Sequence, residues 1–300
     1  MVTHYLPLTK RRVLPGEVMQ FDEAIFISAY NSSDRVQRVF EAVQCESRFW
    51  VQHAEYRDVV PGESFATDTS DEMQFWLDFE EWRGQPFGNE GPRLVFDITG
   101  MMRPHLLTLL LLLSYRGVKE ATFLYSDPVS YSAGHKTTFS KGAITGVRQV
   151  QGFEGNHLRG AEEILLIGSG YDDELIRSVA EAKRSAKKYQ LFGLPSLQPH
   201  MYQENRLRAA RASESLDTMA RSRLIYAPAN DPFATAEEVS ALFRRLEPSH
   251  DGRNFYLSPL GTKPQTLGFG LFYLCEVRDQ QRPFSLIYPF RAGYESETSS

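Results

Sequence analysis

Cysteine, long apolar runs and a surplus of positive charge are all missing from this 300-residue chain. Its two cysteines, Cys45 and Cys275, lie far apart, which argues against a disulfide framework and indicates buried thiols in a reducing compartment. The most apolar stretch, residues 106–113, is well short of the ~20 residues of a membrane span. Because the amino-terminal stretch also lacks the pattern of a signal peptide, we expect a cytoplasmic protein without membrane contact.

The formal net charge is -5 and the sequence pI is about 5.9. This balance excludes a broad basic surface for duplex nucleic acid, although it allows a local basic pocket. With 42% hydrophobic and 24% charged residues the composition is that of a globular protein. The length allows one large domain or two.

Several motifs of catalysis and cofactor binding are absent. There is no GxGxxG after the first expected strand and no GxxxxGK[ST], which excludes the standard dinucleotide and Walker phosphate loops. The absence of GxSxG weakens the case for a nucleophile-elbow hydrolase. The histidines show neither HExxH nor paired spacing, and the acidic residues lack two-metal nuclease spacing. We therefore predict neither a metal site nor a resident cofactor.

What the chain does contain is a regular alternation of short apolar runs with segments of helical periodicity. The expected strands lie at residues 24–29, 47–53, 93–98, 121–126, 164–168, 188–194, 223–227, 255–257 and 284–289. Helical spacing of apolar residues follows most of them. This alternation predicts an α/β fold with mostly parallel sheets.

The same order of elements occurs twice. IFISAYNSSDRVQRVFEA resembles LLIGSGYDDELIRSVAEA, and VFDITGMMRPHLLTLLLLL resembles YLSPLGTKPQTLGFGLFYL. We infer a tandem duplication of a Rossmann-like unit. The predicted units are residues 1–127 and 161–294, with a Gly-rich β insertion or hairpin linker at 128–160 and a flexible tail at 295–300.

The second pair of similar segments is a strand, a glycine-containing turn and a helix opened by a basic residue and proline. The basic residues are Arg103 and Lys263. Unpaired N–H groups and the positive end of the dipole make such a helix start attractive to anions. Met101 and Met102 stand where the second copy has Thr262, so if one copy alone binds phosphate, we expect it to be the copy with Lys263.

In open parallel sheets, ligands bind beyond the carboxyl ends of the strands, near the point where strand order reverses. The candidate ligand-binding residues at such ends are Ser28, Tyr30, Asn31, Asp97, Thr99, Gly100, Arg103, Gly168, Tyr171, Asn230, Ser258, Gly261, Thr262, Lys263 and Gln265. The candidates for catalysis are Asp97, Asp172 and Asp231.

Each of these residues also has a structural interpretation. Gly100 and Gly261 supply positive φ, and the basic residues Arg103 and Lys263 are solvated. The carboxylates cap helices or form turns. The aromatic segment 73–82 predicts a short helix that packs a lid or an interface, with cofactor binding the less favoured interpretation.

The two strand–turn–helix motifs, DITG-x-x-RP and SPLGTKPQTLG, resemble the strand-end motif of the CARF family, Rossmann-like sensor domains of CRISPR and other antiviral systems. The resemblance implies a site for a cyclic oligonucleotide or another phosphate-bearing nucleotide. It would include Gly261, Thr262 and Lys263, a weaker copy at Thr99, Gly100 and Arg103, and the loops 28–31 and 168–171.

Two features depart from that family. CARF proteins usually form their site by dimerisation and are usually fused to an effector, whereas this chain carries both copies and no recognisable effector. The resemblance therefore implies a sensor or regulatory subunit, whose two halves frame the pocket and whose effector is a separate protein from the same operon. Two alternatives stay open: a nucleotide hydrolase or transferase using the strand-end aspartates, and a non-catalytic structural subunit of a defence or DNA-processing complex.

Overall fold

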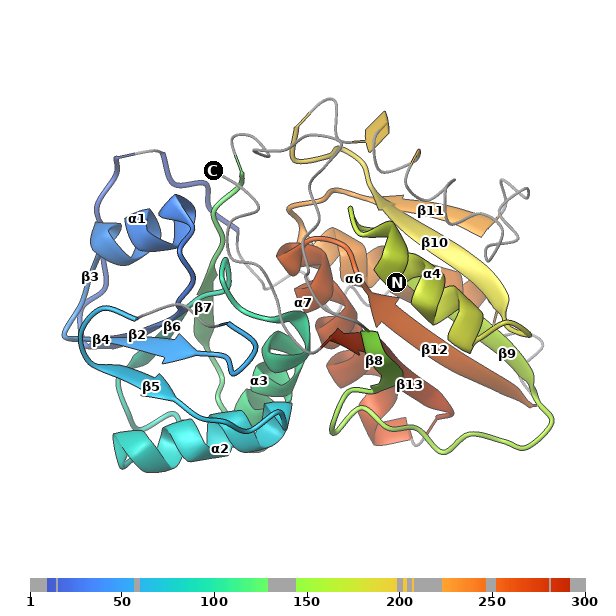
Figure 1. The fold of residues 1–300 in the computed structure, drawn as a ribbon, viewed down its shortest axis with the longest axis horizontal. Helices are drawn as coiled ribbons and strands as arrows, with labels where there is room; N and C mark the ends of the chain where they lie inside the picture. Colours follow the sequence, from blue (N-terminus) through green and yellow to red (C-terminus); the bar gives the residue numbers. More distant parts are fainter. Residues whose placement is uncertain are drawn as a thin grey trace. The chain divides into compact units, whose positions relative to one another are not determined.

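The computed structural model describes residues 10–14, 16–56, 60–128, 144–198, 202–203, 207, 223–246, 252–280 and 282–291. The chain divides into an N-terminal unit, Leu6–Lys141, and a C-terminal unit, Gly142–Ala292 (Figure 1). The division falls inside the segment 128–160 that the sequence predicts as a linker. In the described part of the chain, no helix has the length and apolar character needed to cross a membrane.

The N-terminal unit is built on a five-stranded parallel sheet. Its strands are β2 (Ala24–Ala29), β4 (Ser47–Gln52), β5 (Ser64–Ala66), β6 (Arg93–Asp97) and β7 (Ala121–Leu124), in the order β5-β4-β2-β6-β7. Its helices are α1 (Asp34–Ala42), α2 (Glu72–Arg83) and α3 (Arg103–Tyr115). A small parallel pair joins β1 (Met19–Gln20) to β3 (Val43–Gln44).

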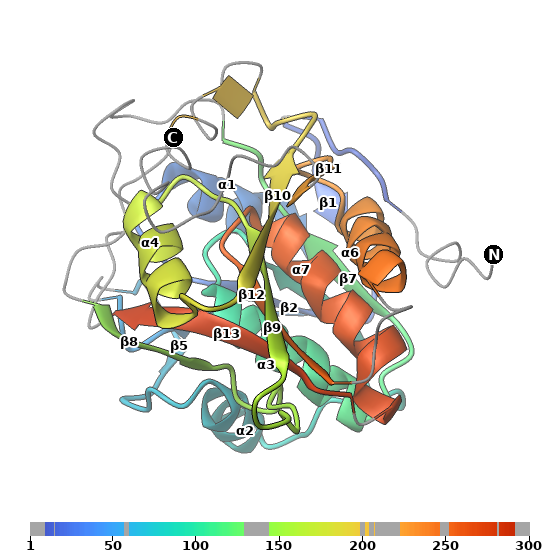
Figure 2. The same cartoon turned by 90° about the vertical axis from the view of Figure 1, so that its right-hand side faces the viewer.

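The C-terminal unit is built on a six-stranded sheet. Its strands are β8 (Ile144–Gln149), β9 (Glu162–Gly168), β10 (Lys187–Gly193), β11 (Leu224–Ala227), β12 (Arg253–Pro259) and β13 (Phe284–Arg291), in the order β11-β10-β9-β12-β13-β8. Every pairing is parallel except that of β8 with β13. Its helices are α4 (Asp173–Ala182), α6 (Pro232–Leu246) and α7 (Lys263–Phe272), and α7 continues into a π-helical turn, Tyr273–Val277, and a 3₁₀ turn, Arg278–Gln280. Figure 2 shows α4 on one face of this sheet and α6 and α7 side by side on the other.

The two large sheets share one strand order. When the antiparallel edge strand β8 is set aside, each sheet has its first parallel strand (β2 or β9) at the centre, the next two on one side of it, and the fourth and fifth on the other. Strand order therefore reverses between β2 and β6 in one unit and between β9 and β12 in the other. These positions are the switch points at which Rossmann-like sheets bind ligands. The structure confirms an α/β fold with mostly parallel sheets; common ancestry of the units stays a prediction.

Apolar runs account for the core of the N-terminal unit. All six residues of β2 are buried, and α3 is buried from Pro104 to Leu113, since its leucines leave no polar face. The aromatic residues Phe75, Trp76 and Phe79 of α2 are 0% exposed, and the Trp76 indole donates to the His105 carbonyl at 2.7 Å. The interpretation of this segment as a lid is therefore wrong for these three residues, because their rings belong to the core.

A few elements differ from the sequence prediction. The short strand β5 was not predicted, because its segment is polar and irregular. Helix α6 begins at Pro232, after Asp231, whose carboxylate accepts from the Phe233 and Ala234 N–H groups at 3.0 Å. The strand β8 joins the second sheet at its edge. Residues 129–143, residues 208–222 and the tail 295–300 lie outside the described residues.

Candidate functional site

The two loops at the switch point of the N-terminal unit touch each other. A Cβ atom added to Gly100 would lie 2.0 Å from the Ala29 carbonyl oxygen and 3.2 Å from the side-chain nitrogen Nδ2 of Asn31. No side chain fits in that space, so Gly100 is needed for close approach. The loop after β2 and the loop after β6 therefore meet at Gly100.

The corresponding loops of the C-terminal unit also touch, but here the glycine, Gly170, lies in the loop after the central strand β9. A Cβ atom on Gly170, after β9, would lie 2.0 Å from the Leu260 carbonyl oxygen, after β12. Gly168 packs against α7, since a Cβ atom there would lie 3.1 Å from the Phe269 ring. The candidates Gly168, Ser258 and Gly261 are thus held near this contact.

Asp97 is the most deeply buried of the three candidate aspartates, at 0% exposure. Its carboxylate accepts from the Ser28 hydroxyl and from the Thr99 N–H, both at 2.9 Å. Burial raises the pKa of Asp97, opposed by hydrogen bonds from Thr99 and Ser28 and by the charge of Arg35. The Thr99 hydroxyl in turn accepts from the Ser126 N–H at 3.0 Å. Asp97 thereby joins the ends of β2 and β6 and the loop after β6.

Helix α3 begins with Arg103 and Pro104 at its first two positions. Its N-cap is Met102, which offers no side-chain hydrogen bond, and the Met102 N–H donates to Nε2 of His53 at 3.2 Å. His53 lies just past the end of β4 and is 0% exposed, and its ring centroid is 4.2 Å from that of His105. Arg103 is partly buried.

Helix α7 begins with Lys263 and Pro264 at the equivalent positions. Its N-cap, Thr262, forms a capping box with Gln265: the Gln265 N–H donates to the Thr262 hydroxyl at 3.3 Å, and the Thr262 N–H donates to Oε1 of Gln265 at 3.2 Å. The Thr262 hydroxyl also donates to the Ala229 carbonyl. Thr262 and Lys263 are partly exposed, whereas Gln265 is 1% exposed.

The other two candidate aspartates cap helices. Asp172 accepts from the Leu175 N–H at the start of α4 and lies 3.5 Å from the buried guanidinium of Arg291. Asp231 caps α6 through the two N–H groups described above. Both positions favour the structural interpretation of these carboxylates over a catalytic one.

The remaining candidates lie at strand ends but differ in surroundings. The Tyr30 ring packs edge-on against Trp50, with centroids 5.1 Å apart, and Asn31 accepts from the Ser33 N–H at 3.1 Å. Tyr171 is partly buried and Asn230 is exposed.

Three residues that organise these sites were not predicted: His53, which holds the start of α3; Arg35, whose guanidinium donates to the Ser126 carbonyl at 2.7 Å; and Ala229, which holds Thr262. His53 stands 49 positions before Met102, and Ala229 contributes only a backbone carbonyl. Only the strand order brings these groups together, so no local pattern could have revealed them.

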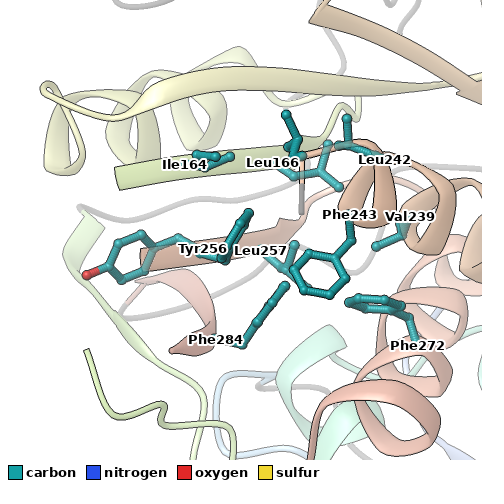
Figure 3. A pocket seen from close by; sticks show the side chains of 11 residues that line it. Ile164, Leu166, Val239, Leu242, Phe243, Tyr256, Leu257, Phe272 and Phe284 are labelled. Carbon is teal, nitrogen blue, oxygen red and sulfur yellow. The ribbon is translucent and has the colours of Figure 1, made fainter. Parts of the chain in front are cut away.

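The structure also contains a small hollow between β9 and β12 and the helices α6 and α7. Its walls are apolar side chains that include Leu166, Phe243 and Phe272 (Figure 3). None of the predicted site residues lines it. A polar ligand would find no hydrogen-bonding partner on these walls, so the hollow belongs to the core.

Within the described ranges, no group of three or more His, Cys, Asp or Glu residues is placed to hold a metal ion. No family model and no curated protein matches the chain. Among solved structures the chain is similar to CobK precorrin-6A reductase, with a TM-score of 0.25 and 10% sequence identity over 88% of this chain and 87% of that one. A likeness at this level carries no argument about function.

Proposed function

We propose that this chain is a nucleotide-binding sensor or regulatory subunit of a prokaryotic antiviral defence system, acting with a separate effector protein from the same operon. The single observation that carries nucleotide binding is the pair of helix starts at the switch points. Each places a basic residue, Arg103 or Lys263, at the first position of a helix that follows the fourth parallel strand of its sheet, β6 or β12. The antiviral setting rests on the resemblance of the two motifs to the CARF family.

The chemistry of these helix starts suits phosphate. A helix start carries a partial positive charge, and a lysine or arginine beside it adds a full one. Both turns bring the backbone of neighbouring loops into contact through a glycine. Proline at the second helical position removes one N–H donor from each site, so the basic side chain has to supply more of the affinity.

The alternative of a nucleotide hydrolase or transferase has less support. Its three candidate carboxylates are engaged in hydrogen bonds within the fold: Asp97 bridges two strand ends, and Asp172 and Asp231 cap helices. A structural subunit without a ligand is the alternative that the binding experiment below can distinguish.

The proposal is tested by calorimetric titration of the full chain with a panel of ATP, GTP, cyclic di-AMP and cyclic tri-AMP. We expect one of these nucleotides to bind, and Lys263→Ala to weaken that binding at least about tenfold, since a charge-assisted phosphate contact is lost. Arg103→Ala is expected to weaken it less.

The matched controls are Lys187→Ala and Arg93→Ala, which remove exposed basic residues from the opposite, amino-terminal edges of the same two sheets. Circular dichroism checks that each variant is folded. Binding that is unchanged in both Lys263→Ala and Arg103→Ala, or that falls equally in the controls, would sink the proposal.

A further inference from the structure

The start of α7 is closed in this structure by its own side chains. The Thr262 N–H donates to Oε1 of Gln265, and the Gln265 N–H donates to the Thr262 hydroxyl. Pro264 has no N–H. Three of the first four positions, from the N-cap to the third helical residue, therefore offer no backbone donor to a phosphate in this conformation.

The Gln265 side chain that closes the site uses its amide oxygen but not its amide nitrogen in hydrogen bonds. Because Oε1 of Gln265 must face the Thr262 N–H, the orientation of the amide is fixed, and Nε2 points the other way. Nε2 lies 3.7 Å from the position of a Cβ atom on Gly193, and it has no hydrogen-bond partner although Gln265 is 1% exposed. A buried donor left unpaired destabilises the conformation that buries it.

Gly261 makes room for this arrangement. A Cβ atom at position 261 would lie 2.4 Å from Oε1 of Gln265, so any other residue would push the amide away from the Thr262 N–H. The turn is thus shaped to admit the glutamine side chain at the place where an anion would bind.

From these contacts we propose that Gln265 is a latch, a side chain that competes with a phosphate-bearing ligand for the Thr262 N–H. The latch holds the helix start closed in the empty protein, and a phosphate oxygen takes its place on the N–H when ligand binds. The unpaired Nε2 makes the latched conformation less favourable, which lowers the cost of opening it. This inference rests on the proposed function, since it describes the regulation of the same site.

The test measures affinity for inorganic pyrophosphate, which reports on the helix start without a base or ribose. Gln265→Met keeps the volume of the side chain and removes its acceptor. If the latch operates, Gln265→Met binds pyrophosphate about three- to tenfold more tightly than wild type, the value of one hydrogen bond no longer in competition. Gln265→Glu retains an acceptor and adds a negative charge, so its affinity falls.

The outcomes separate the latch from the proposed site. Weaker binding in Lys263→Ala together with unchanged or weaker binding in Gln265→Met overturns the latch and keeps the site. Unchanged binding in Lys263→Ala overturns the site and the latch with it. If wild type shows no binding, a gain in Gln265→Met supports the latch, and no binding in either protein overturns it. Thermal unfolding of each variant confirms that it is folded, and Gln265→Leu, which also lacks an acceptor, replaces Gln265→Met if that variant does not fold.

Discussion

Helices α3 and α7 begin with the same residue types, but the N–H group of the N-cap residue is hydrogen-bonded to a different kind of partner in each. Both start with a basic residue and a proline, after an N-cap whose N–H needs an acceptor. In α7 that acceptor is Gln265, three residues further along the chain. In α3 the acceptor is His53, which lies just past the end of β4. One start is thus specified by local sequence, and the other by the tertiary fold.

The buried polar groups beneath the two helix starts differ in the same manner. The sheet register pairs Ser28 with Asp97 in one unit and Ile167 with Ser258 in the other. Asp97 finds a donor in Ser28, whereas the hydroxyl of Ser258, also 0% exposed, has no hydrogen-bond partner. The polar group at the end of the strand before the helix is therefore hydrogen-bonded in the N-terminal sheet and lacks a hydrogen-bond partner in the C-terminal sheet.

The largest expected effect tests whether the two loop contacts are equivalent. Gly100→Ala and Gly170→Ala each place a methyl group 2.0 Å from a backbone carbonyl oxygen, which only a shift of the backbone can relieve. We expect each to lower the free energy of unfolding by about 4 kcal/mol or more. Urea denaturation followed by circular dichroism measures the loss.

Gly88→Ala is the control, because a Cβ atom there meets nothing within 4 Å. A loss below about 1 kcal/mol in either loop variant would show that its loop moves aside, and the two contacts would no longer be comparable.

Much of the fold could be predicted from the sequence, because its strands are short, continuous apolar runs. The strand at 24–29 was placed at its observed bounds, and the comparison of the two motifs put Met101 and Met102 opposite Thr262; of these, Met102 and Thr262 are N-caps. Such features depend on residues close together in the chain, where period and capping rules apply.

The site could be predicted only in outline. Whether Asp97 bridges strands or faces a ligand depends on which residue lies opposite it, and the sheet register that places Ser28 there joins positions 69 apart. The hydrogen bonds between Thr262 and Gln265 at the start of α7 could have been predicted, since the two residues have capping-box spacing. The hydrogen bond from the Met102 N–H to His53 at the start of α3 could not have been predicted, because nothing in the sequence around His53 indicates it.

The second prediction tests the contrast between Asp97 and Ser258. Asp97→Ala leaves the Ser28 hydroxyl and the Thr99 N–H without their acceptor, so we expect a loss of about 2–4 kcal/mol. Ser258→Ala removes a buried hydroxyl that has no partner, so the variant should be about 1 kcal/mol more stable than wild type. Urea denaturation at pH 7 compares both with wild type, and equal losses would erase the contrast.

Asp97→Asn adds a pH test of the same group. Since burial raises the pKa of Asp97 in the folded protein, the folded state retains this proton at a pH where the unfolded state has lost it. The resulting stability is present below the unfolded pKa and is lost as pH rises through the folded pKa. The neutral amide does not titrate, so the gap between Asp97→Asn and wild type should move in favour of the variant as pH rises from 4 to 8. A gap that stays constant would contradict this assignment.

The smallest expected effect concerns His157, whose pH response is opposite to that of Asp97 and which contacts Ser285 at the amino-terminal end of β13 in the C-terminal sheet. The hydroxyl of Ser285 accepts from the Gln149 amide and the Gly155 N–H, both at 2.8 Å, and lies 2.7 Å from Nε2 of His157. With both lone pairs occupied, the hydroxyl must donate its proton to His157, which therefore has to be neutral. Protonation would present a third donor to an oxygen that has no acceptor site left.

Burial lowers the pKa of His157, with a further lowering from Lys183 against opposing contributions from a hydrogen bond to Asn254 and from the charge of Glu163. The folded state therefore binds this proton less readily than the unfolded state, and stability falls as pH drops below the unfolded value of about 6.5. His157→Phe keeps the ring that stacks on Tyr256, with centroids 4.5 Å apart, and removes the titration. Between pH 7.5 and 5.5, wild type should lose more stability in urea than His157→Phe. Parallel losses would mean that the Ser285 contact survives protonation, and the two units would then not differ in the sign of their response to pH.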